Sequence, residues 1–69
     1  MPLSARNQLS GTVRSVETDG LVAEVTIELD GGETVTSVIT SNSVDRLGIA
    51  EGEAVDAVVK ATEVMVQRE

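Results

Sequence analysis

Ser4-Ala5-Arg6-Asn7 places a hydroxyl, a guanidinium and an amide within four residues near the start of the chain. All three groups donate hydrogen bonds. A tetrahedral dianion needs several convergent donors together with positive charge, and the planar fork of arginine matches a pair of oxygens. Taken alone, the segment is better explained as a solvated lead-in to a strand. An anion site here needs support from elsewhere in the chain.

Lys60 is the lone lysine of an acidic chain, and it stands at the end of an apolar run, two positions before the hydroxyl of Thr62. A single lysine at such a place can protect the edge of a sheet against aggregation. It can equally supply the cationic contact of an anion site. The sequence leaves both interpretations open.

Thr40-Ser41-Asn42-Ser43 concentrates small hydroxyl and amide residues just before a Val44/Leu47 pair with helical spacing. The pattern predicts the start of a short helix, where free backbone N–H groups and the helix dipole favour an anion. The alternative is ordinary N-capping by Ser41 or Asn42. The two roles are compatible, because a capping hydroxyl can also face a ligand.

The composition argues against an enzyme and against a nucleic-acid-binding protein. The chain has no Cys, His, Phe, Trp or Tyr, so the usual nucleophile, base and transition-metal arrangements are missing. Its carboxylates are scattered without a calcium-loop pattern, so we expect no catalytic residues, no cofactor and no direct protein–metal ligands. The charge of 5 − 12 = −7 repels polyanions, and stacking platforms for bases are absent.

Length and hydropathy predict a cytoplasmic protein of one domain, residues 1–69, that associates with itself. No apolar run approaches the ~18 residues of a spanning helix, and Met1-Pro2-Leu3-Ser4 lacks the features of a signal peptide. We therefore expect no membrane contact. A chain of 69 residues lies near the lower limit for independent folding, and without cysteine the remaining source of stability is association of subunits.

The elements that must position these residues are predicted from alternation and turn signals. Leu9, Gly11, Val13 and Ser15 are expected on one face of the first strand, and Asp30-Gly31-Gly32 indicates a hairpin. The fold class is therefore all-β, a five-stranded OB-like antiparallel barrel with one short helix between strands 3 and 4. The expected strands cover residues 7–17, 22–29, 34–40, 54–61 and 64–66, and the expected helix covers residues 41–48.

Taken together, these segments make the sequence closely resemble the molbindins, single-domain molybdate-binding proteins also called molybdenum-pterin-binding proteins. These are related to domains that follow some molybdate-transport ATPases. The match covers the whole chain, and one departure is Ala61, where the family often has serine. The matching segments are Ser4-Ala5-Arg6-Asn7-Gln8-Leu9-Ser10-Gly11, Ala23-Glu24-Val25, Thr36-Ser37-Val38-Ile39-Thr40 with Ser43-Val44, and Val58-Val59-Lys60-Ala61-Thr62-Glu63-Val64-Met65.

The resemblance implies a homohexamer, a trimer of dimers, that binds oxyanions at its subunit interfaces and stores molybdate for molybdenum homeostasis. The resemblance also implies tungstate as a second ligand. The residues carried over are Ser4, Ala5 (through its backbone) and Arg6 with Lys60 for one interface class, helped by Thr40, Ser41, Asn42 and Ser43. A competing interpretation is an OB-type protein-interaction or regulatory module that binds no anion.

Overall fold

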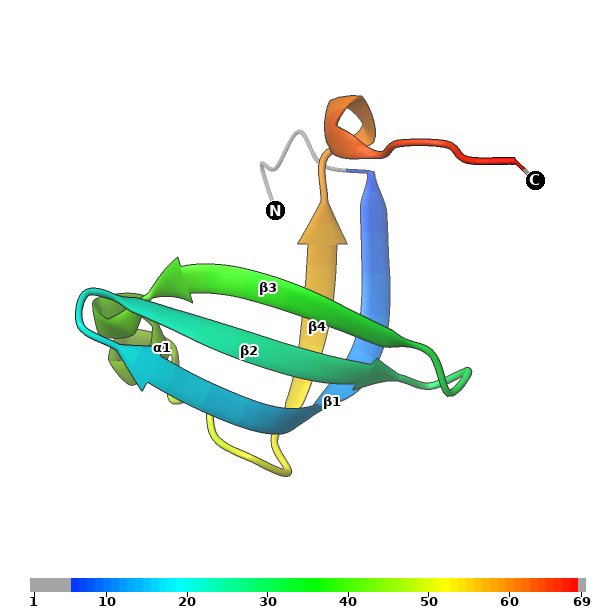
Figure 1. The fold of residues 1–69 in the computed structure, drawn as a ribbon. Helices are drawn as coiled ribbons and strands as arrows, with labels where there is room; N and C mark the ends of the chain where they lie inside the picture. Colours follow the sequence, from blue (N-terminus) through cyan, green and yellow to red (C-terminus); the bar gives the residue numbers. More distant parts are fainter. Residues whose placement is uncertain (1–5, 69) are drawn as a thin grey trace.

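The computed structural model describes residues 6–68 as a curled antiparallel sheet with one short α-helix (Figure 1). Neighbouring strands follow the order β3-β2-β1-β4, and the helix lies between the third and fourth strands in the chain. None of the helices in this described part has the length and apolar character needed to cross a bilayer. The elements are β1 (Asn7–Asp19), β2 (Val22–Leu29), β3 (Thr34–Thr40), α1 (Ser41–Leu47), β4 (Ala54–Val59) and the 3-10 helix η1 (Ala61–Glu63).

The core is built from the inward face of β2 and the strands beside it. Ala23, Val25 and Ile27 alternate with more exposed residues along β2 and are almost fully buried, which is the pattern of a strand with one solvated face. Val13 of β1 and Ala57 of β4 join Val25 and Ile27 in one cluster. These side chains are small, so each buries little surface.

A β-bulge in β1 corrects the expected alternation of that strand. Val13 pairs with Ile27, but the next pair is Ser15 with Thr26, so one extra residue, Arg14, is inserted on the β1 side. After the bulge the inward positions change parity, and Val16 instead of Ser15 packs against the core. The prediction that Ser15 shares the face of Val13 was therefore wrong.

The expected fifth strand is the main correction to the predicted fold. Residues 64–66 form no strand in the described part of the chain, and the sheet there has four strands. β4 ends at Val59, and after Lys60 the short helix η1 begins at Ala61 and turns the chain. An extended segment becomes a strand only when a neighbouring backbone completes its hydrogen bonds, and residues 64–66 meet no such neighbour here. The first strand also differs from the prediction. β1 continues through Thr18 to Asp19, where the sequence predicted that a turn begins at Thr18.

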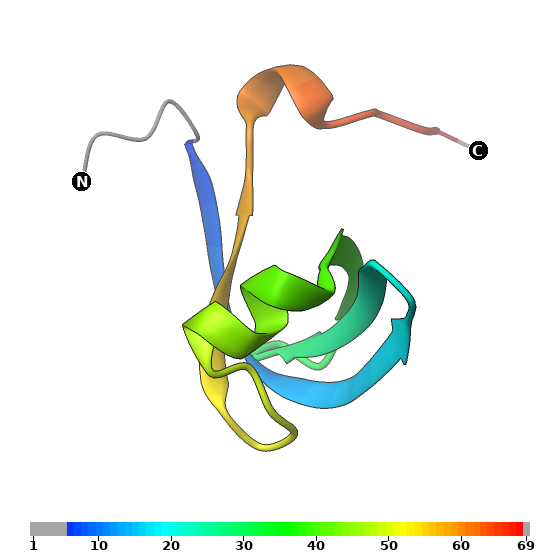
Figure 2. The same cartoon turned by 90° about the vertical axis from the view of Figure 1, so that its left-hand side faces the viewer.

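The first half of β1 and the whole of β4 rise from the curled sheet as a two-stranded arm (Figures 1 and 2). β1 pairs with β4 over residues 7–12 and with β2 over residues 11–19. Gly11 sits where the two pairings overlap, opposite both Leu29 and Val55. A Cβ atom at Gly11 would lie 2.5 Å from the Glu28 carbonyl oxygen, so the close approach of β1 to β2 requires glycine at this crossing.

Candidate functional site

The free end of the arm brings Arg6 and Lys60 together, although they are far apart in the sequence. Asn7 pairs with Val59 in the last rung of the β1–β4 ladder, and the Asn7 side-chain amide also donates to the Val59 carbonyl at 3.1 Å. Arg6 immediately precedes this rung and Lys60 immediately follows it. Both residues are exposed. Their predicted companions Ser4 and Ala5 lie outside the described residues.

The charges of Arg6 and Lys60 are not paired with any carboxylate of residues 6–68. The ion pair found in that range joins Arg14 and Glu28 at 2.9 Å on the outer face of the sheet. Two cationic side chains next to one rung can present several N–H donors to one anion. The sequence pattern alone did not show that Arg6 lies next to Lys60; the pairing of β1 with β4 shows it.

The second predicted group, at the start of α1, is organised by Thr40. Its Oγ1 accepts from the Ser43 backbone N–H at 3.0 Å and donates to the Ser43 hydroxyl at 2.7 Å. Thr40 is therefore the N-cap, and the expectation of a cap at Ser41 or Asn42 was wrong. The helix ends as expected at Gly48, which takes a left-handed conformation with φ 65°.

Ser41 ties the helix to the β1–β2 hairpin. Its hydroxyl oxygen lies 2.8 Å from the Gly20 carbonyl and 3.2 Å from the Val22 carbonyl, so its proton is directed at the backbone. The Ser41 backbone N–H donates to the Leu21 carbonyl at 2.9 Å. Of the four predicted residues here, Thr40 and Asn42 are exposed, and Asn42 is the one whose side chain makes no hydrogen bond with the described residues.

Arg46 is a cation near this group that sequence reasoning missed. Its Nη2 donates to the Ser43 hydroxyl at 3.2 Å, one helical turn away. The i, i+3 spacing of Ser43 and Arg46 within an expected helix was the available signal. Arg46 lies in the last turn of α1, where a cation also complements the helix dipole.

Replacing Thr40 by alanine is expected to lower the free energy of unfolding by about 1 kcal/mol, because the Ser43 N–H loses its capping oxygen. Urea denaturation of the variant and of Thr40→Ser measures this loss. Serine keeps the hydroxyl and serves as the matched control. If both variants were equally destabilised, the methyl group of Thr40 would matter more than its cap.

The two groups lie at opposite ends of β1. Arg6 and Lys60 flank the rung at its beginning, whereas Ser41 is hydrogen-bonded to Gly20, immediately after its end. Figures 1 and 2 both place α1 away from the tip of the arm. One chain therefore does not combine the two predicted groups into one site. Within residues 6–68 no cluster of carboxylates is arranged to hold a metal ion.

Comparison with known proteins assigns this geometry to a family. The TOBE domain model matches residues 3–66. Molybdenum-pterin-binding protein 3 of Clostridium pasteurianum is 47% identical over 66 residues, which cover 96% of this chain and 97% of that protein. A molybdate-binding protein from Sporomusa ovata has a solved structure that superposes with a TM-score of 0.92 at 34% identity, over 99% of this chain and 100% of that one.

A third relative shows the same fold within a longer chain. The cytoplasmic molybdate-binding protein ModG, whose structure contains molybdate, is 48% identical with a TM-score of 0.84, and the match covers 88% of this chain and 43% of that one. The family model and the first relative each span nearly the whole sequence. The chain therefore belongs to the TOBE-domain family, within its molbindin group of molybdenum-pterin-binding proteins, and the resemblance noted in the sequence is confirmed.

Proposed function

We propose that this protein binds molybdate between copies of itself and stores it in the cytoplasm for molybdenum homeostasis, without catalysis and without a cofactor. Two observations support the proposal. Relatives that match nearly the whole chain are described as molybdenum-pterin-binding and molybdate-binding proteins. In addition, Arg6 and Lys60 flank the Asn7–Val59 pair at the tip of the arm of a strongly acidic protein. The proximity of these two cationic residues is the single observation on which the proposed site rests.

In the proposed main site, Arg6 and Lys60 supply charge-assisted hydrogen bonds to the oxyanion, together with Ser4 and the backbone of Ala5. Donors at the tip of one chain approach a tetrahedral anion from one side, so in the proposed site the coordination is completed by a second copy. A symmetric assembly then repeats the same site at each equivalent interface. Ala61 offers no hydroxyl at a position where the family resemblance leads us to expect serine, so we expect this site to depend more on its two cations.

Thr40, Ser41, Asn42 and Ser43 assist at a second class of interface. Asn42 is exposed, while Thr40 and Ser43 are hydrogen-bonded to each other and Ser41 to the neighbouring hairpin. Asn42 is therefore the side chain of this group most open to a ligand, and the other three hold its position. This group lies beyond the C-terminal end of β1, whereas Arg6 and Lys60 lie at its N-terminal end. The two classes of interface are therefore separate.

The proposed assembly is a homohexamer built as a trimer of dimers, with no nucleic acid or membrane as a partner. The net charge of −7 per chain repels an anion at long range, but that field is screened over about 10 Å at ordinary ionic strength. Short charge-assisted bonds inside an interface are screened far less. Tungstate, another tetrahedral dianion, is expected to occupy the same site.

Saturating molybdate is expected to raise the thermal midpoint of the protein and to shift its mass distribution toward the hexamer. A ligand at 100 times its Kd stabilises the bound state by about 2.7 kcal/mol per site. Calorimetry, thermal unfolding and light scattering at matched concentrations measure the effect, with sulfate as the control dianion. No heat of binding and no shift with molybdate would overturn the proposal in favour of a protein-interaction module.

A further inference from the structure

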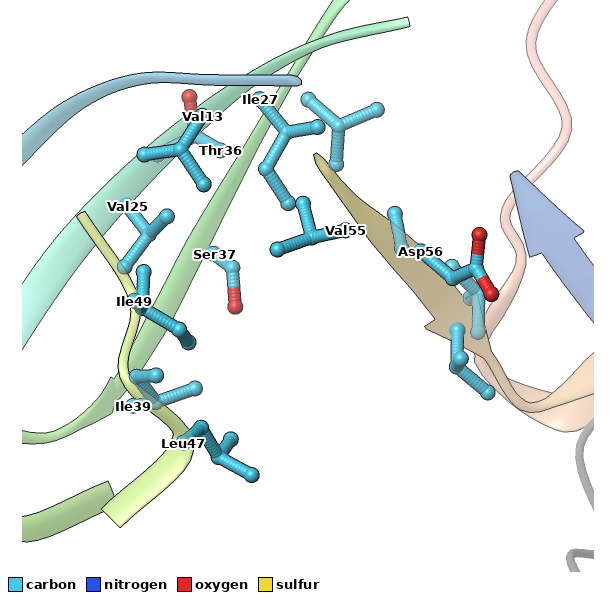
Figure 3. A pocket seen from close by; sticks show the side chains of 14 residues that line it. Val13, Val25, Ile27, Thr36, Ser37, Ile39, Leu47, Ile49, Val55 and Asp56 are labelled. Carbon is cyan, nitrogen blue, oxygen red and sulfur yellow. The ribbon is translucent and has the colours of Figure 1, made fainter. Parts of the chain in front are cut away.

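Asn7 is a polar residue on the inner side of the arm, where its neighbours in β1 and β4 are apolar residues and glycine. Figure 3 shows the two sides of β4: Val55 is directed toward core residues such as Ile27, and Asp56 lies on the other side. Side chains alternate along a strand, so Val59 shares the inner side with Val55, and so does Asn7, its partner in β1. An amide on an apolar face costs free energy unless it is hydrogen-bonded. The bond that Asn7 makes therefore indicates why the residue is there.

The contact made by Asn7 holds the backbone that leads into Lys60. Asn7 Nδ2 donates to the Val59 carbonyl oxygen at 3.1 Å, and the bond is partly buried. This oxygen and the Lys60 N–H belong to one peptide unit, whose atoms lie close to a plane. Holding the oxygen therefore fixes the orientation of that plane and, with it, the position of the Lys60 Cα atom. The Lys60 side chain itself stays exposed.

Asn7 is tied to Arg6 by the chain itself. The Asn7 N–H and the Arg6 carbonyl form the preceding planar unit, so one residue is joined to one cation by a peptide bond and to the peptide of the other by a hydrogen bond. Strand pairing brings the two backbones together, but Asn7 and Val59 are the last pair of the ladder. The side-chain bond therefore adds a constraint at the point where the constraints from β-pairing end.

We propose that Asn7 is a positioning residue of the anion site: its amide sets the spacing of Arg6 and Lys60 without itself contacting the anion. The inference rests on the proposed function and deepens it. It differs from the sequence pattern, which grouped the amide of Asn7 with the donors to the anion. An N–H of this amide is instead used on the Val59 carbonyl. Donors held in place before binding lose less freedom when the ligand arrives, and they bind it more tightly for that reason.

Replacing Asn7 by leucine, which has a similar size but no hydrogen-bonding group, is expected to weaken molybdate binding about five- to tenfold. Isothermal titration of the full chain measures the change. The same substitution is then made in a Lys60→Ala variant. With Lys60 gone, no pair of cations remains to be spaced, so we expect a further loss of less than about twofold. A general destabilisation of the arm would weaken binding in both proteins alike.

Ser10→Ala is the matched control. Ser10 Oγ donates to Asp56 Oδ1 at 3.3 Å, which is also a side-chain hydrogen bond between β1 and β4, but it lies on the outer side and away from the tip. Its removal is expected to change molybdate affinity by less than about twofold. Asn7→Ala repeats each titration without adding an apolar side chain at the tip, so the test does not depend on the folding of one variant. Circular dichroism confirms the fold of each protein.

A loss that appears in the native protein and disappears in the Lys60→Ala variant supports the proposal. Unchanged affinity in Asn7→Leu and Asn7→Ala overturns it. Equal losses with and without Lys60, or an equal loss in Ser10→Ala, overturn it as well. The failure of the proposed function is distinguishable: a native protein that gives no heat with molybdate refutes the anion site itself. A native protein that binds, and that needs Arg6 and Lys60 but not Asn7, refutes this inference alone.

Discussion

Replacing Arg6 and Lys60 together by alanine is expected to lower the affinity for molybdate at least ~100-fold, because hydrogen bonds to charged groups are each worth about 1.5–3 kcal/mol and each ~1.4 kcal/mol is tenfold in Kd. Neither residue is ion-paired with a described carboxylate, so their removal leaves no unpaired anion behind in this part of the protein. Isothermal titration with molybdate measures the change.

Arg14→Ala is the matched control for this experiment. It removes the same type of charge, but Arg14 sits at the bulge in β1 and is paired with Glu28 on the exposed face of the sheet. We expect its molybdate affinity to stay within about twofold of the native protein, because an exposed ion pair contributes little and lies away from the rung. An unchanged affinity in the Arg6/Lys60 variant would exclude both residues from the site.

Gly11→Ala is expected to lower the free energy of unfolding by about 3 kcal/mol, at the upper end of the range for overpacked positions. The new Cβ would lie 2.5 Å from the Glu28 carbonyl oxygen and 2.8 Å from Cγ2 of Ile27. The first of these is backbone near one end of the β1–β2 ladder, so relief requires the two strands to separate there. Urea denaturation followed by circular dichroism measures the loss.

Gly31→Ala provides a control with a similar apparent clash. Its Cβ would lie 2.7 Å from Oε1 of Glu33, which is the end of a flexible side chain on an exposed turn. That side chain can rotate away, so we expect a change within about 0.5 kcal/mol, as for an ordinary surface substitution. Equal losses for the two variants would show that the close approach of β1 to β2 is not what requires glycine.

The parts of the fold set by local patterns were predicted from the sequence. The alternation in Val22–Leu29 placed β2 with its bounds correct, and Asp30-Gly31-Gly32 placed the hairpin that leads to β3. The hydroxyl-rich start and Gly48 bracketed α1. These features depend on side chains within a few residues of one another, so periodicity and turn chemistry suffice to find them.

The errors arose where the structure depends on a distant partner. The bulge at Arg14 is visible only when β1 is aligned with β2, because an extra residue changes no local propensity. Residues 64–66 have the composition of a strand, but whether they form one depends on which backbone lies beside them. A single sequence contains no record of that neighbour.

In the candidate site, too, the sequence predicted what depends on residue type, and the structure was needed for what depends on distant contacts. Ser4-Ala5-Arg6-Asn7, Lys60 and the Thr40 segment were all singled out by residue type, and the position of Arg6 beside Lys60 then emerged from the pairing of Asn7 with Val59. The capping role of Thr40 and the contact of Arg46 with Ser43 required side-chain geometry. Contacts between subunits are set by the assembly, so individual ligand contacts stay predictions.

The Asn7–Val59 rung joins positions 52 residues apart in the chain, so its closure is a non-local step that brings distant segments together at a cost in chain entropy. It also stands at the tip of the arm, where few buried contacts oppose opening. Each opening separates Arg6 from Lys60. For the proposed site we therefore expect the residence time of the anion to be coupled to the fraying rate of this terminal rung, with release that does not require unfolding of the whole domain.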